Sequence, residues 1–238
     1  VYLSLGGEVR GAIPAHPRLS SRSRNHSGAA LSSDDAIITR LSARLLTAPP
    51  PLPAAETLVP DWAPEIPFAR PPVPAAVLIA LVRRPEGHTV LYTERSPDLR
   101  AHSGQVAFPG GKVDEGDADV AAAALREAFE EVGMERADAT VLGFMPTYFT
   151  GTNYLITPVV AVVEPSGPFV PNPGEVHSVF EVPLRRILAN EAYGQFRIRR
   201  NGAEHRAWQI DHDGHRIWGI TANLTRRFRD LAMSEAVP

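Results

Sequence analysis

The segment from Gly110 to Met134, GGKVDEGDADVAAAALREAFEEVGM, constrains the fold of this chain more than any other segment. An α-helix advances roughly 100° per residue. If the angle of Glu127 around the helix axis is set to zero, Glu131 lies at roughly 40° and Glu130 at roughly 300°. The three carboxylates therefore share one helical face. The opposite side collects the apolar residues of the segment, which are Ala121, Ala122, Leu125, Ala128, Phe129 and Val132. This pattern predicts an amphipathic helix packed on a sheet.

Both ends of the predicted helix carry stop and start signals. Asp117 or Asp119 can cap the N-terminus, because an aspartate oxygen accepts a hydrogen bond from the first free backbone amides. Gly133 follows the last turn and supplies the left-handed residue that ends many helices. The sequence thus predicts a helix of about residues 118 to 132.

A pair of glycines precedes this helix. The short apolar stretch Gln105 to Phe108 reads as a strand, and Pro109, Gly110 and Gly111 follow it. We expect a paired-glycine turn at this point. Because glycine has no side chain, its backbone can approach a ligand or a metal ion closely.

The three glutamates are an unfavourable group if they serve only as a solvated face. Like charges three and four residues apart on a helix repel by roughly 0.2 to 0.5 kcal/mol per pair. Only Arg126 is close enough in sequence to offset them. A divalent cation would resolve the conflict, and hard carboxylate oxygens suit Mg²⁺ or Mn²⁺. The chain has no cysteine and no tight histidine cluster that would indicate zinc.

The segment resembles the box of the Nudix hydrolases, in which R-E-U-x-E-E-x-G-U, with U an aliphatic residue, forms the second half. Arg126 to Met134 match this half throughout. In the first half, the acidic position falls on Asp117 rather than a glutamate, and eight residues instead of seven separate it from Arg126. This spacing is similar to the coenzyme A pyrophosphatase branch, whose longer motif resembles Leu91 to Gly111 with its core LRxHxGQVxFPGG.

The resemblance implies roles for individual residues. Glu130 and Glu131 are expected to bind metal, Glu127 to bind metal or to orient and deprotonate a water, and Arg126 to fix the carboxylates. The resemblance also implies that the carbonyl of Gly110 completes the metal shell. Weaker candidates are a further base or ligand at Glu175 and phosphate-binding or loop-ordering residues at Arg95, Arg100, His102 and Lys112. Each of these cations also suits an ordinary exposed position.

The function implied by the resemblance is metal-dependent hydrolysis of the diphosphate of coenzyme A or its thioesters. The products would be 3′,5′-ADP and 4′-phosphopantetheine or its acyl form. Two alternatives stay open: a Nudix hydrolase acting on ADP-ribose, a dinucleotide or a nucleoside triphosphate, and a noncatalytic metabolite-binding module. Tyr148, Phe149 and Tyr154 could line an adenine or pantetheine pocket, although core packing is the simpler use of such residues.

Composition restricts the partners. Apolar residues make up 44% of 238 positions, and the net charge of −3 argues against a broadly basic nucleic-acid surface. The longest apolar run, Val73 to Val82, is too short to cross a bilayer. The absence of cysteine is compatible with a reducing cytoplasm, where we expect the protein to act on a small-molecule diphosphate. The sequence leaves the oligomeric state open.

Three regions follow from shifts in composition. Residues 1–33 are rich in Ser, Gly and Arg and are expected to be disordered, whereas residues 34–74 should form a short helix and a proline-rich arm. Residues 75–238 should form the Nudix domain, an α/β/α sandwich with a mixed sheet. Strands are predicted near 75–83, 89–95, 104–108, 140–148, 155–163, 177–182, 195–200, 204–210 and 215–218, with a turn at Asp213–Gly214 and a last helix near 220–232.

Overall fold

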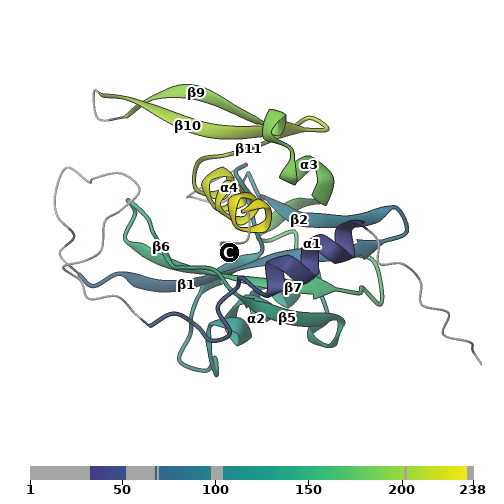
Figure 1. Ribbon diagram of the computed structural model, residues 1–238. Helices are drawn as coiled ribbons and strands as arrows, with labels where there is room; N and C mark the ends of the chain where they lie inside the picture. The colour runs from purple at the N-terminus through teal and green to yellow at the C-terminus, as the bar shows by residue number, and fades with distance from the viewer. Residues whose placement is uncertain (1–32, 52–67, 69, 98–103, 201–202, 235–238) are drawn as a thin grey trace, which may run out of the picture. The chain divides into compact units, whose positions relative to one another are not determined.

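The computed structural model describes residues 33–51, 68, 70–97, 104–200 and 203–234 (Figure 1). Most of the predicted N-terminal extension and of the proline-rich arm lies outside these residues. The same holds for Arg100 and His102.

An eight-stranded mixed sheet forms the centre of the described chain. Its main path runs β3-β2-β1-β7-β5, while β4 pairs with β1, β6 with β7 and β8 with β2. The long strands β1 and β7 are parallel to each other, and every other pairing is antiparallel. The strands are β1 (Val73–Arg84), β2 (Gly87–Arg95), β3 (Val106–Ala107), β4 (Gly110–Lys112), β5 (Ala139–Phe144), β6 (Tyr148–Phe149), β7 (Tyr154–Val163) and β8 (Val176–Pro183).

Helices cover both faces of this sheet, which confirms the predicted α/β/α arrangement (Figure 1). The helix α2 (Val120–Val132) packs on one face, where Leu78 and Val159 are fully buried. The other face packs against α1 (Ser33–Ser42), α3 (Leu184–Leu188) and α4 (Gly219–Met233). Alternation of side chains along β1 and β7 supplies apolar residues to both layers.

The ends of α2 lie where the sequence predicts them. Asp119 caps the helix, with its Oδ1 accepting a hydrogen bond of 2.7 Å from the amide of Ala122. Gly133 adopts φ 65° and ends it. The predicted apolar face is wrong at Phe129, which is 53% exposed. Ala123 and Ala124 are fully buried, so the buried arc is centred closer to the glutamates than the apolar residues alone suggest.

The predicted glycine turn is also corrected by the structure. Gly110 and Gly111 belong to β4, whose residues pair with Val77, Ala76 and Ala75 of β1. A Cβ on Gly110 would collide with the carbonyl oxygen of Ala76. Bare backbone is therefore required here by a close strand pairing, not by a turn.

A second sheet of three strands precedes the last helix. It contains β9 (Tyr193–Arg200), β10 (Ala203–His212) and β11 (His215–Trp218). Asp213 and Gly214 have φ angles of 47° and 84° and connect β10 to β11, which confirms the predicted turn. Two short 3₁₀ helices, Arg136–Asp138 and Asn190–Ala192, complete the described elements. The predicted strand 140–148 is interrupted after Phe144, because Pro146 cannot donate to a strand ladder.

Residues Ser33 to Leu46, which we call the α1 clasp, join three separate elements. At one end, the carboxylate of Asp34 accepts a hydrogen bond of 2.8 Å from the amide of His88. Further along, Arg44 Nη1 donates to the carbonyls of Leu231 and Ala232 at the end of α4. At the other end, Leu46 forms an isolated bridge with Phe144 of β5. Ile38, Leu41 and Leu45 are buried in the core between these contacts.

No helix in the described ranges is long and apolar enough to cross a bilayer.

Candidate active site

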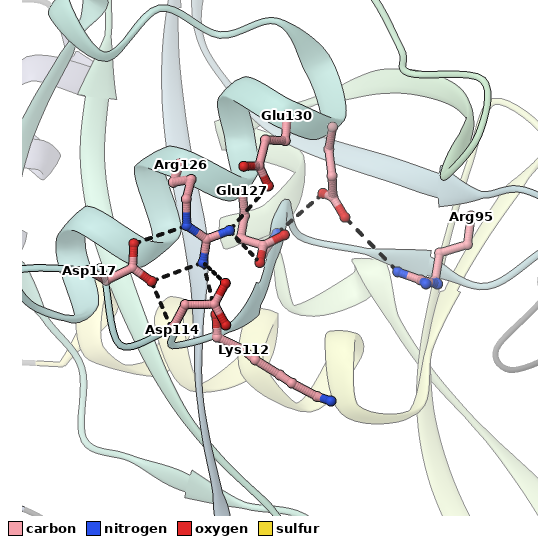
Figure 2. A network of polar contacts seen from close by, with 9 residues as sticks. Arg95, Lys112, Asp114, Asp117, Arg126, Glu127 and Glu130 are labelled. Carbon is pink, nitrogen blue, oxygen red and sulfur yellow. Dashed lines mark hydrogen bonds and ion pairs between the residues drawn. The ribbon is translucent and has the colours of Figure 1, made fainter.

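Arg126 of α2 is the centre of a group of acidic residues (Figure 2). Its guanidinium donates two hydrogen bonds of 2.9 Å to Asp117, and Nη1 donates at 3.0 Å to Glu127 and at 3.1 Å to Glu130. Nη2 also donates to the carbonyl of Lys112 at 3.1 Å. One arginine thereby fixes the side chains of two helix glutamates and joins the helix to β4.

Asp117 belongs to this group, although its motif position alone does not assign it to the site. Its side chain is only 5% exposed. The paired bonds from Arg126 hold the pKa of Asp117 below its ordinary value, so it remains charged at neutral pH. The sequence shows Asp117 at the acidic position of the upstream motif. It does not show that this residue contacts Arg126, nine residues later in the chain.

Glu131 lies deeper than the other two glutamates, against the sheet. Its side chain is 4% exposed, and Oε2 accepts a hydrogen bond of 3.2 Å from the amide of Gly110. Arg95, at the end of β2, places Nη1 4.0 Å from Oε1. Burial is the main cause that raises the pKa of Glu131 to about 8, and the charge of Glu127 raises it further.

Glu127 lies between these two groups. Its side chain is 15% exposed, and burial raises its pKa while the bond from Arg126 opposes that shift. A Cβ on Gly111 would collide with the carboxylate of Glu127. The second glycine of β4 therefore leaves the space that this carboxylate occupies.

The loop before β8, which contains Glu175, lies at the C-terminal end of α2. The amides of Val170 and Asn172 donate 2.8 Å hydrogen bonds to the carbonyls of Val132 and Glu131, which otherwise lack helical partners. Glu175 is exposed, yet its charge contributes to the raised pKa of both Glu127 and Glu131. The structure thus gathers this predicted residue with the helix glutamates.

The remaining predicted residues divide into two groups. Arg95 reaches Glu131, whereas the exposed ammonium of Lys112 extends away from the carboxylates in Figure 2. Arg100 and His102 fall outside the described residues. Only the backbone carbonyl of Lys112 contributes to the acidic group.

The donor set suits a hard divalent cation. Within the described ranges, no three His, Asp or Glu side chains are already grouped closely enough to hold a metal ion. However, Glu131 is buried and Glu127 is half-buried, the two carboxylates repel each other, and a cation would lower the pKa of both. Glu130 is 49% exposed and would have to turn from Arg126 to join them. Glu127 and Glu131 are therefore the pair that best fits a metal ion.

A surface pocket of about 610 Å³ lies elsewhere, beside the start of the α1 clasp. It is lined in part by Asp34, Arg84, His88 and Glu181. None of the predicted site residues lines it, so it plays no part in the arrangement described above.

Comparison with known proteins identifies the family of the chain. Residues 72–201 match the family profile of the NUDIX domain. The chain is 46% identical over 163 residues to an uncharacterized Nudix hydrolase, NudL, of Escherichia coli, across 68% of this chain and 83% of that protein. The same values hold for NudL of Shigella boydii serotype 18.

Among solved structures, the chain matches RenU, a Nudix hydrolase from M. Smegmatis, at 21% identity and a TM-score of 0.47. That match covers 71% of this chain and 89% of RenU. Nudix hydrolases generally use divalent cations and act on small diphosphate substrates. With the NUDIX profile matched over more than half of its length, the chain belongs to the Nudix hydrolase family.

Proposed function

We propose that this protein hydrolyses the diphosphate of coenzyme A or its thioesters, with Mg²⁺ or Mn²⁺, to 3′,5′-ADP and 4′-phosphopantetheine or its acyl form. The observation that carries the hydrolytic part is the arrangement of the buried Glu131 and the half-buried Glu127, two carboxylates with raised pKa values beside β4. Two neighbouring carboxylates of this kind are costly to the folded protein unless a cation offsets their charge.

The residues have distinct proposed roles. A bound divalent cation offsets the charge of the diphosphate and lowers the pKa of water. Glu127, Glu130 and Glu131 would hold it, and the carbonyl of Gly110 is a further candidate ligand. Glu127 or Glu175 would accept the proton of the attacking water. Arg126 acts at one remove, by fixing the orientation of Glu127 and Glu130.

The choice of coenzyme A is supported by the segment Leu91 to Gly111. Its resemblance to the coenzyme A pyrophosphatase motif suggests that these residues recognise the substrate. Two parts of this segment border the carboxylates: Arg95 lies 4.0 Å from Glu131, and the amide of Gly110 donates to Glu131. A substrate-specific motif next to the hydrolytic group favours this substrate over other diphosphates.

A substrate panel tests the proposal. Purified protein is incubated with coenzyme A, ADP-ribose and NADH, with and without Mg²⁺ or Mn²⁺, beside Glu131→Gln, and the products are identified by mass spectrometry. We expect metal-dependent release of 3′,5′-ADP and 4′-phosphopantetheine from coenzyme A, and loss of this activity in the variant. Cleavage of ADP-ribose or NADH alone would refute the substrate, whereas no cleavage of any compound would favour the binding-module alternative.

A further inference from the structure

One row of residues crosses four strands beside the candidate active site. Lys112 of β4 pairs with Ala75 of β1, Ala75 pairs with Ile156 of β7, and Ile156 pairs with Tyr148 of β6. Neighbouring strands lie about 4.8 Å apart, so this row extends over about 14 Å of sheet. It starts at the strand whose glycines contact the catalytic carboxylates and ends at an aromatic ring.

The row lies on the sheet face opposite to α2. Gly111 faces Glu127 on the α2 side, so alternation along β4 directs Lys112 to the other side. Figure 2 agrees, since the Lys112 side chain extends away from the acidic residues. On that face the row has a cation at its first position and only the uncharged side chains of Ala75, Ile156 and Tyr148 after it.

A second cation, Arg227 of α4, stands at the far end of the row. Its guanidinium carbon lies 4.5 Å from the centre of the Tyr148 ring, which is a cation–π contact. Asn223, one helical turn earlier, donates a 2.9 Å hydrogen bond to the Tyr148 hydroxyl. Tyr148 is 3% exposed, so a buried and anchored ring holds an exposed guanidinium in place. In Figure 1, α4 lies over the sheet near β6.

Arg227 differs from the two other arginines near it on α4. Arg226 lies over Trp208 and is 3.9 Å from Asp230, and Arg229 pairs with Asp230 at 2.6 Å. Arg227 has no hydrogen bond or ion pair with any residue that the structure describes. No described residue accepts from its five N–H donors, and a guanidinium binds phosphate oxygens in a planar, two-point manner.

We propose that Arg227 is a specificity-determining residue that binds the second anionic group of the substrate, the one remote from the diphosphate. This inference rests on the proposed function, in which that group is the 3′-phosphate of coenzyme A. The diphosphate lies at the β4 end of the row, near Lys112, and the adenosine extends toward Tyr148. Lys112 stands at one end of the row, and the Tyr148 ring that holds Arg227 stands at the other.

Kinetics with two related substrates test this inference. The rates of Arg227→Gln, Arg227→Lys and the matched control Arg226→Gln are measured on coenzyme A and on dephospho-coenzyme A, which lacks the 3′-phosphate. We expect Arg227→Gln to raise the KM for coenzyme A about tenfold or more, with kcat nearly unchanged and no effect on dephospho-coenzyme A. Arg227→Lys should retain part of the preference, and Arg226→Gln should retain all of it.

A binding measurement separates this inference from the proposed function. Calorimetry compares adenosine 3′,5′-bisphosphate with AMP on wild-type protein and Arg227→Gln, without turnover. Preferential binding of the bisphosphate that is lost in Arg227→Gln supports the inference even if coenzyme A is not cleaved, an outcome that would refute only the proposed function. An unchanged preference, equal weakening of both ligands, or no binding by the wild type overturns it.

Discussion

Arg126 and Asp117 are joined by two hydrogen bonds of 2.9 Å each, one from Nε and one from Nη2. The same guanidinium holds Glu127 and Glu130, so the orientation of the helix carboxylates depends on a residue in the loop before the helix. We therefore expect Asp117 to affect activity, although its carboxylate contacts Arg126 and not Glu127 or Glu131.

Replacing Asp117 with Asn tests this dependence. The variant keeps the shape but removes the charge that pairs with Arg126, so we expect a loss of about 1 to 3 kcal/mol of stability. We also expect kcat/KM to fall by about tenfold to a hundredfold, because Glu127 and Glu130 lose their fixed orientation. Asp114→Asn is the control, since Asp114 is exposed and lies 3.6 Å from the same guanidinium. Equal effects in both variants would contradict the dependence.

Gly111→Ala should mainly reduce activity, whereas Gly110→Ala should mainly reduce stability. At Gly111 the new methyl displaces only the end of the Glu127 side chain, so we expect activity to fall at least about tenfold with little loss of stability. At Gly110 the methyl meets the backbone of Ala76 and Val77, so stability should fall by about 1 to 3 kcal/mol. Gly116→Ala, which meets nothing within 4 Å, is the control for both. Thermal unfolding and steady-state rates give the two readouts.

Glu131 should make the metal-free protein less stable as pH rises. Its folded-state pKa of about 8 lies above the ordinary value of 4.5, so the folded protein keeps a proton that the unfolded chain releases. Stability should therefore be highest below about pH 4.5 from this group and fall by about 1 kcal/mol per pH unit until about pH 8. Denaturant unfolding in EDTA measures this slope.

Glu131→Gln is the matched control for that slope. It should remove the contribution of this one group, and the difference from wild type should grow with pH. Adding Mg²⁺ or Mn²⁺ at pH 8 should raise the melting temperature of the wild type more than that of the variant. A parallel pH dependence in the two proteins would show that Glu131 is not protonated in the folded state.

The α1 clasp should contribute to the folding of the whole molecule. Leu41 is 1% exposed in the core, so Leu41→Ala should cost about 2 to 5 kcal/mol of stability. Arg40→Ala, at the adjacent exposed position, should change stability by less than about 0.5 kcal/mol. Chemical denaturation that follows Trp fluorescence and circular dichroism checks both. Separate unfolding transitions by the two probes in the wild type would contradict the prediction that the α1 clasp and the core unfold together.

Local signals in the sequence were sufficient for most elements. The cap at Asp119, the stop at Gly133 and the turn at Asp213 and Gly214 depend on the conformation of one or two residues, and all three are confirmed. The prediction failed where distant pairing decides. Glycine disfavours strands, yet Gly110 and Gly111 form β4 because β1 offers a free edge.

The site shows the same division. The glutamates of α2 could be placed on one face from helix geometry, and the structure adds which one is buried. Glu131 lies beneath the surface because Ala123, Ala124 and Ala128 let the helix approach the sheet closely, which a charge pattern does not reveal. The bond between Arg126 and Asp117 depends on the path of the intervening loop. Local periodicity does not encode that path.

The α1 clasp and α4 extend the folding unit beyond the range that matches the family profile. A fragment limited to residues 72–201, the range by which the family is recognised, would keep every carboxylate of the acidic group. It would lack both α1 and α4, and so would present Ile79, Leu81 and Val160 to water. The range that matches the family profile is thus shorter than the range that must fold as one unit.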